Sequence, residues 1–246
     1  MKKFLLSIIT LFICVVCYGA TFNQYWYIED NAPIQTSCTT GGDIILPTPP
    51  IKYGYDFIGW EKLPYVPIEY LESTGTQYID TGLTVNDGDI SATAVFMPTS
   101  FVVNDTYACI FGINGNFQAA YTGTGTAHIG NTSSLQQFFY LYKKATVKGV
   151  LSSSMPQIYY VDNVSTGLSR TFNTDKRLML LDAEPHRFAA RGRLYSFIAS
   201  RNNKVIMDLI PVLDSNGTPC MYDVVEKKFY YNAGTGQFIA GPVIGE

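Results

Sequence analysis

The chain has 246 residues, of which 47% are hydrophobic and only 15% are charged, and its formal net charge is −3. This apolar content excludes an intrinsically disordered chain, because disordered chains combine few apolar residues with many charges. The mild acidity argues against sequence-independent nucleic-acid binding, which requires a basic face to neutralise phosphates.

Residues 1–20 have the order of an export signal. Two lysines at positions 2 and 3 precede an apolar run over residues 4–17, and the small residues Gly19 and Ala20 follow. The run is shorter than the roughly 20 apolar residues of a typical membrane helix. We therefore predict a signal peptide over residues 1–20, with an uncleaved N-terminal anchor as the alternative. Cleavage would remove two lysines and no acidic residue, which moves the formal charge from −3 to −5.

The rest of the sequence has no apolar run that could form a membrane-spanning helix. We expect the mature chain to be secreted, displayed at the cell surface or held in the periplasm. Three cysteines follow the signal, at Cys38, Cys109 and Cys220. One pair could form a disulfide in an oxidising compartment, but we favour the alternative of three small buried apolar side chains.

Residues 21–62 are expected to form a small β module of their own. Its predicted strands are short and are separated by glycines and prolines: residues 22–28, 43–46 and 54–60. Gly59 interrupts the alternation of apolar residues between Phe57 and Trp60, which predicts a bulge or bend at this position.

The same module carries a recognisable motif. A glycine pair at Gly41-Gly42 is followed by Leu46-Pro47-Thr48-Pro49 and then by Gly54-Tyr55-Asp56-Phe57-Ile58-Gly59-Trp60. In this order the segments resemble the Listeria–Bacteroides repeat. The resemblance implies a small β-grasp-like module of a surface protein, and the single copy implies a spacer or stalk unit.

Residues 63–67 are predicted to link this module to a larger domain. Pro64 and Pro67 lie three positions apart, and prolines disfavour both a helix and the hydrogen-bonded ladder of a sheet. The following domain, residues 68–246, is long enough for one sizeable β-sandwich.

Short strands punctuated by turns predict that sandwich. The chain has 18 tyrosines and 15 phenylalanines, which favour half-buried strands. Residues 90–97 alternate with a period of two and are fairly apolar on both faces, as expected of an inner strand. Further strands are predicted at residues 107–113, 158–161, 177–181, 193–199, 204–210 and 229–231. Hairpin turns are predicted at Asn114-Gly115, at Asp162-Asn163 and at residues 200–203. We expect a strand rather than a helix around residues 135–142, because no capping box precedes it.

Both ends of this domain carry long motifs. The opening motif is residues 69–82, and the closing segments are residues 192–197, 208–212, 217–223 and 229–236. They resemble the concanavalin A-like and laminin-G-like domains of exported gut-bacterial and phage-associated proteins. The resemblance implies a jelly-roll β-sandwich, so the expected fold is all-β with a small β-grasp-like module in front. The same shape serves lectins, adhesins, glycosidases and structural caps, so it does not specify a function.

The sequence contains no persuasive catalytic pair of carboxylates. A glycosidase needs two of them about 5 to 9.5 Å apart, and the Glu-x-Asp-x-x-Glu strand of jelly-roll glucanases is absent. Glu69 and Glu72 are expected to face opposite sides of a strand. Asp182 and Glu184 share strand parity, but Pro185 is expected to end that strand.

Nucleotide, metal and acid–base motifs are also missing. The glycine-rich residues 122–126 lack the full phosphate-binding fingerprints and predict an exposed flexible loop. His128 and His186 are the only histidines, and neither lies near a cysteine in the sequence. Asn86-Asp87-Gly88-Asp89 is the best oxygen cluster for calcium. The same residues favour a simple turn, which we prefer, so no cofactor is assigned.

Tyrosines are the remaining candidates for a binding surface. Tyr140 and Tyr142 share strand parity, and an exposed pair of rings would form a platform for sugars, with core packing as the alternative. Trp60 is predicted to belong to the core of the small module. His186, Arg187, Arg191 and Arg193 form a basic cluster that is expected at a solvated strand edge.

These observations predict a non-catalytic, secreted or surface-displayed module for recognition or adhesion, with a glycan or a host or cell-surface protein as partner. No catalytic, cofactor-binding or metal-binding residue is assigned. The alternative is a structural or phage-derived appendage domain without a defined ligand, and a glycoside hydrolase is the third hypothesis.

Overall fold

The computed structural model describes residues 2–10, 21–27, 34–39, 45–51, 53, 55–84, 90–101, 107–113, 117–129, 132–151, 157–170, 177–183 and 189–244. Within these ranges every regular element is a β-strand, which confirms the expected all-β fold class. The described part of the chain contains no helix long and apolar enough to cross a membrane.

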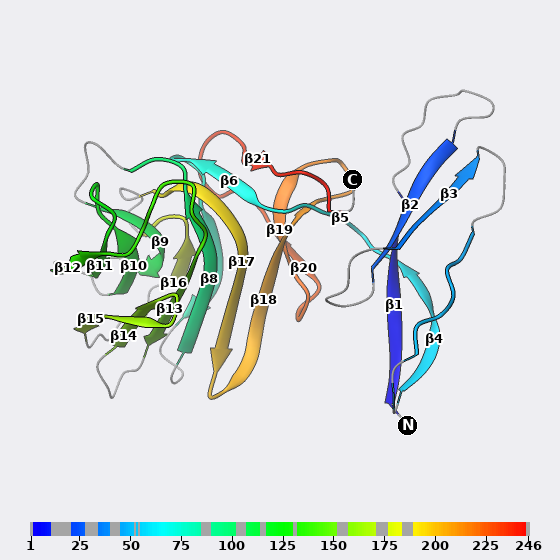
Figure 1. Cartoon of the computed structure of the whole chain (residues 1–246), viewed down its shortest axis with the longest axis horizontal. Coiled ribbons are helices and arrows are strands. Elements are labelled where there is room, and N and C mark those ends of the chain that lie inside the picture. Colours follow the sequence, from blue (N-terminus) through cyan, green and yellow to red (C-terminus); the bar gives the residue numbers. More distant parts are fainter. Residues whose placement is uncertain are drawn as a thin grey trace.

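The strands form three sheets (Figure 1). The N-terminal sheet has the order β3-β2-β1-β4, from β1 (Lys2–Thr10), β2 (Thr21–Tyr27), β3 (Ile34–Thr39) and β4 (Tyr55–Lys62). The six-stranded sheet runs β12 (Thr132–Gln137), β11 (Thr126–Ile129), β10 (Phe117–Tyr121), β9 (Ala108–Ile113), β16 (Arg177–Leu180) and β7 (Ile79–Thr84). The eleven-stranded sheet runs β15 (Val164–Arg170), β14 (Gln157–Val161), β13 (Ala145–Leu151), β8 (Ile90–Pro98), β17 (Arg191–Arg201), β18 (Lys204–Leu213), β19 (Pro219–Asp223) and β20 (Lys228–Tyr230). The short strands β5 (Val66–Pro67), β6 (Leu71–Thr74) and β21 (Ile239–Ala240) pair at its sides.

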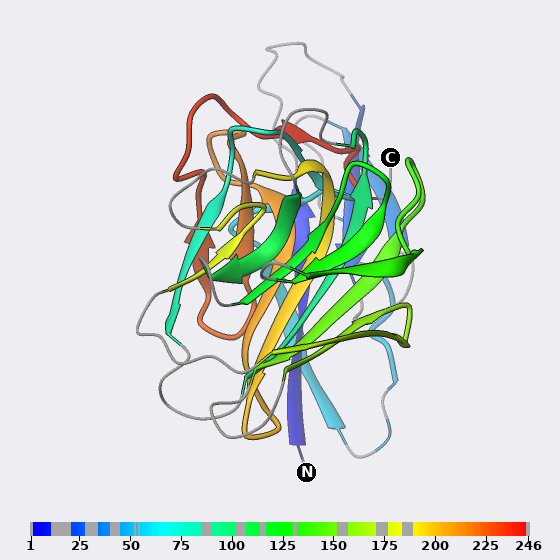
Figure 2. The same cartoon turned by 90° about the vertical axis from the view of Figure 1, so that its left-hand side faces the viewer.

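The six-stranded and eleven-stranded sheets pack face to face as a sandwich. Figure 2 shows it from the side of the six-stranded sheet. Phe111 of β9 and Phe197 of β17 meet across the interface with ring centroids 5.8 Å apart. Strand β8 supplies alternate buried residues from Ile90 to Phe96, as its period of two predicts. Burial of these apolar side chains is the main stabilising contribution to the sandwich.

Two of the three predicted hairpin turns are confirmed. Asp162 and Asn163 have φ of 50° and 64° between β14 and β15, and Asn202 and Asn203 have φ of 51° and 62° between β17 and β18. Two successive left-handed residues are the mark of a type I′ turn, and Asn and Asp tolerate this backbone. The third hairpin joins β9 to β10 by antiparallel pairing, although Asn114-Gly115 lies outside the described residues.

The N-terminal sheet contains the predicted bulge. Its register against β1 shifts between Phe57 and Trp60, and Gly59 has φ of 145°. The indole of Trp60 packs edge-on against that of Trp26, with centroids 4.8 Å apart, and against the Phe57 ring at 5.4 Å. The expected strand at residues 43–46 is not confirmed. Residues 45 and 46 are exposed and belong to no strand, and residues 43 and 44 lie outside the described residues.

Strand β1 falls within the predicted export signal. In the intact chain it lies between β2, to which it is antiparallel, and β4, to which it is parallel. This pairing does not test cleavage, so the signal peptide stays a prediction. The described cysteines Cys38, Cys109 and Cys220 are free, and the last two are fully buried, as small apolar side chains would be.

The linker differs from its predicted form. Val66 and Pro67 pair as β5 with Leu213 and Val212 of β18, so the prolines do not exclude pairing. The pairing needs no N–H from Pro67, whose carbonyl accepts the N–H of Ile244 at 3.1 Å.

Candidate functional site

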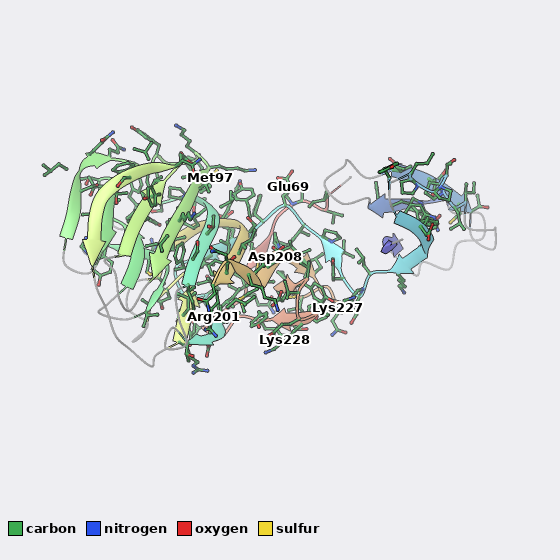
Figure 3. All side chains as sticks on the ribbon, turned by 90° about the horizontal axis from the view of Figure 1, so that it is seen from below. Glu69, Met97, Arg201, Asp208, Lys227 and Lys228 are labelled. Carbon is green, nitrogen blue, oxygen red and sulfur yellow. The ribbon has the colours of Figure 1, made fainter. Side chains whose placement is uncertain are left out.

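A group of exposed and half-buried aromatic and charged side chains lies at one end of β8 and β17. We call it the aromatic–cation surface, and it consists of Tyr70, Glu72, Tyr140, Tyr142, Lys143, Lys144, Arg193 and Tyr195. It is assembled from three distant segments: the approach to β6, the connection between β12 and β13, and the first half of β17. Met97, labelled in Figure 3, lies on β8 beside the β17 part of this surface.

The connection between β12 and β13 presents two tyrosines to solvent. Tyr142 is 67% exposed and Tyr140 is 47% exposed. Tyr142 has φ of 59°, a left-handed conformation that a bulky residue seldom adopts. Its N–H donates to the carbonyl of Pro98 at 2.9 Å, which holds the turn against the end of β8. The Lys143 ammonium lies 5.3 Å from the centroid of the Tyr140 ring.

A buried anchor positions this turn. The N–H groups of Phe138 and Phe139 both donate to the carbonyl of Gly125, at 3.0 and 2.8 Å. Gly125 has φ of 74°, and a Cβ there would collide with the Phe139 carbonyl, so only glycine fits. Phe139 is buried in the sandwich core. The expected strand therefore ends at Gln137, and Tyr140 and Tyr142 lie in a turn and not on a strand face.

The same contacts correct the prediction for residues 122–126. The hydroxyl of Thr122 bonds those of Thr124 and Thr126, at 3.0 and 2.7 Å. Gly123 and Thr124 are exposed as expected, but Gly125 is buried beneath the aromatic turn. This segment is a hydrogen-bonded turn that supports residues 138–144.

An ion pair and a ring contact define the sheet side of the surface. Nε of Arg193 donates to Oε2 of Glu72 at 2.7 Å, across the paired strands β17 and β6. The guanidinium also lies 4.3 Å from the centroid of the Tyr70 ring. The hydrogen bond to Glu72 raises the pKa of Arg193 further. The guanidinium is thus a fixed cation with one face against an aromatic ring.

Tyr195 joins the sheet side to the turn. Its ring contacts Tyr70 edge-on, with centroids 5.5 Å apart, and the Lys144 ammonium lies 3.8 Å from its centroid. Its hydroxyl is 3.8 Å from Sδ of Met97. Partial burial raises the pKa of Tyr195, so the hydroxyl remains a neutral donor and acceptor at ordinary pH.

The predicted basic cluster is placed differently from expectation. Arg191 and Arg193 lie where β17 pairs with β6 on one side and β8 on the other, so they are not at a sheet edge. The prediction was wrong because the short strand β6, which covers β17, is contributed from a distant part of the chain. His186 and Arg187 lie outside the described residues.

The other predicted residues do not assemble a catalytic or metal centre among the described residues. Glu72 is held by Arg193, and Asp182 is buried, with Oδ1 accepting the N–H of Ala183 at 2.7 Å. His128 is buried against Tyr107 and bonds the Ser133 hydroxyl through Nδ1 at 2.8 Å. No cluster of three or more His, Cys, Asp or Glu residues suited to a metal ion occurs in the described ranges. The candidate calcium turn 86–89 and Glu184 lie outside those ranges.

Two hollows lie near the linker and the N-terminal module. One, of about 570 Å³, is lined by Trp60, Phe57 and residues 46–49, so Trp60 both packs on Trp26 and borders a groove. The other, of about 390 Å³, lies between the linker and the β19–β20 hairpin, and includes Tyr65 and Tyr222.

Comparison with known proteins gives a similarity of fold to a solved structure. No protein-family model matches the chain, and no curated protein matches it. Among solved structures, a "putative carbohydrate binding protein" from Bacteroides ovatus is similar, with a TM-score of 0.50 and 10% sequence identity. The similarity covers 94% of this chain and 72% of that one. At this identity it shows the fold alone, and it agrees with the all-β sandwich. The family resemblances of the sequence stay predictions.

Proposed function

We propose that this protein is a non-catalytic recognition module that binds carbohydrate through the aromatic–cation surface. The observation that carries the proposal is the exposed ring of Tyr142 on a left-handed backbone. Within the described residues the ring makes no ring contact, hydrogen bond or ion pair. A strained position whose side chain adds little packing is more easily explained by binding than by folding.

The chemistry of the surface suits a sugar. Pyranose rings have an apolar C–H face that packs on an aromatic ring and hydroxyls at the rim that need hydrogen-bond partners. Tyr140 and Tyr142 offer the rings, and Lys143 offers a donor beside Tyr140. The Arg193–Glu72 pair offers a donor and an acceptor on the sheet side of the surface. The similar protein from Bacteroides ovatus is named as a carbohydrate binding protein, which supports carbohydrate as the ligand class.

The proposed location follows from the predicted export signal. A module exported to the cell surface or the medium would meet glycans of the environment or of other cells. Residues 21–62 would then act as a spacer or stalk unit in front of the binding domain. Fractionation of expressing cells, with N-terminal sequencing of the exported chain, tests this part of the proposal.

A glycan array probed with the full chain tests the binding itself. We expect reproducible binding to one group of related oligosaccharides. We expect Tyr142→Gly and Tyr195→Ala each to reduce it about fivefold or more, since each ring contributes about 1 kcal/mol or more. Tyr53→Ala is the matched control, because Tyr53 is a fully exposed tyrosine in the N-terminal module. Uniform absence of binding, together with self-association, would instead favour a structural appendage.

A further inference from the structure

The hollow between the linker and the β19–β20 hairpin combines apolar walls with two cations. Its apolar part includes Leu63, Pro64 and the paired rings of Tyr65 and Tyr222, whose centroids are 4.4 Å apart. Its volume of about 390 Å³ lies in the range of small-molecule sites, which is roughly 300 to 1,000 Å³. It is built from the end of the N-terminal module, the linker and the β19–β20 hairpin, and shares no residue with the aromatic–cation surface.

Lys62 and Lys227 line this pocket from two different parts of the chain. Lys62 is the last residue of β4, and Lys227 lies in the turn between β19 and β20. Both side chains are exposed, and neither has an ion pair, hydrogen bond or ring contact among the described residues. Two cations without a partner in the described residues give this hollow a local positive charge, which favours an anionic ligand.

The backbone of Lys227 is left-handed, at the end of the turn that joins β19 to β20. Its φ is 57°, a conformation in which glycine is favoured and a long side chain is strained. The neighbouring Lys228 differs, because its ammonium lies 4.8 Å from the Tyr230 ring centroid. Figure 3 shows Lys227 on the side of the sandwich that faces the N-terminal sheet. The strained residue is thus the one whose cation lines the pocket.

We propose that this pocket binds an acidic sugar, whose anionic group lies between Lys62 and Lys227 and whose ring packs on the apolar walls. The chain itself is acidic, with a net charge of −3, so attraction of an anion requires a local pair of cations such as this one. The site would be distinct from the aromatic–cation surface.

Titration of the full chain with digalacturonic acid tests this proposal. Binding is measured by isothermal titration calorimetry or by amide chemical shifts. We expect saturable binding that weakens with added salt, because the attraction is screened. The dimethyl ester of the same disaccharide has no charge and should bind at least about fivefold more weakly. Galactose 6-sulfate shows whether the anion is preferred as a carboxylate or a sulfate; binding of either acid supports the proposal.

Three lysine variants localise the binding. Lys62→Gln and Lys227→Gly should each weaken the binding of digalacturonic acid about threefold to fivefold, as expected for loss of one exposed ion pair. Glycine suits the left-handed backbone at position 227, so this variant removes the cation without straining the turn. Lys228→Gln removes the same charge from the same hairpin and should change the affinity less than twofold.

Several results would overturn the proposal. They are equal binding of the acid and its ester, full binding by the Lys62→Gln and Lys227→Gly variants, or an equal loss in Lys228→Gln. Tyr142→Gly should leave this binding unchanged, so failure here and failure of the aromatic–cation surface are distinguishable. Loss of digalacturonate binding in Tyr142→Gly would move the acidic sugar to that surface and contradict the pocket.

Discussion

At the scale of single residues, positive φ separates structural positions from candidate binding positions. Four of the described non-glycine residues with positive φ are Asp or Asn in hairpin turns, where this backbone is tolerated. Leu181 also has φ of 64°, but its side chain is completely buried and its burial offsets the strain. Tyr142 and Lys227 have neither compensation, and both lie at proposed ligand sites.

This distinction predicts that glycine has different effects on stability at two left-handed positions. Tyr142→Gly relieves backbone strain but adds flexibility to the unfolded chain, so the free energy of unfolding should stay within about 1 kcal/mol of the wild type. Leu181→Gly removes a buried side chain and should lower it by about 2–5 kcal/mol. Urea denaturation of both variants measures the difference. A large loss of stability in Tyr142→Gly would show that the ring has a structural role.

Buried thiols give a second prediction at this scale. Burial, with a smaller effect of Asp214, raises the pKa of Cys220 to about 12, and burial raises that of Cys109 well above its ordinary value. The reactive thiolate is therefore scarce and inaccessible. Iodoacetamide at pH 8 should modify neither residue in the folded chain and both in urea, as peptide mass spectrometry would show. Rapid modification of either in the folded state would contradict the buried placement.

At the scale of elements, the turn between β18 and β19 depends on one carboxylate. Oδ1 of Asp214 accepts the N–H groups of Asn216 and Thr218, both at 2.8 Å, and Oδ2 accepts the hydroxyl of Tyr231 at 3.0 Å. Burial opposes ionisation of Asp214, but these hydrogen bonds outweigh it and lower its pKa. The charged form is thus stabilised by folding.

The depressed pKa predicts an acid-dependent contribution to stability. It is complete above the unfolded-state pKa of about 3.9 and is lost as the pH falls through the folded-state pKa. Asp214→Asn should therefore cost on the order of 1–2 kcal/mol at pH 7 and less at pH 2.5. Urea denaturation at both pH values tests this, with Ser215→Ala in the same turn as control. A difference that is constant with pH would refute it.

The elements that the sequence predicts well are those decided locally. The turns at Asp162-Asn163 and Asn202-Asn203 follow from the backbone preferences of Asn and Asp, and the bulge at Gly59 follows from broken alternation. The aromatic turn was not predictable in this way. Its shape depends on the carbonyl of Gly125, which is distant in the sequence from Phe138 and Phe139.

At the scale of the whole molecule, the sandwich follows from the pattern but the candidate site does not. Period-two strands and frequent turns lead to two packed sheets, whatever the details of their pairing. The aromatic–cation surface forms only when three segments come together. They carry Tyr70 and Glu72, Tyr142 and Lys144, and Tyr195. No local signal marks those residues, because their proximity is set by the pairing of β6 and β8 with β17.

The central claim is that a sugar binds at this surface, and mapping the bound ligand tests it most directly. Amide chemical shifts of the full chain would be followed during titration with the oligosaccharide that binds best in the array. We expect saturable changes concentrated at residues 138–144 and 191–195, with little change at residues 201–205 around the β17–β18 turn, at the other end of β17. Changes concentrated outside these two segments, or no saturable change with any glycan, would contradict the account.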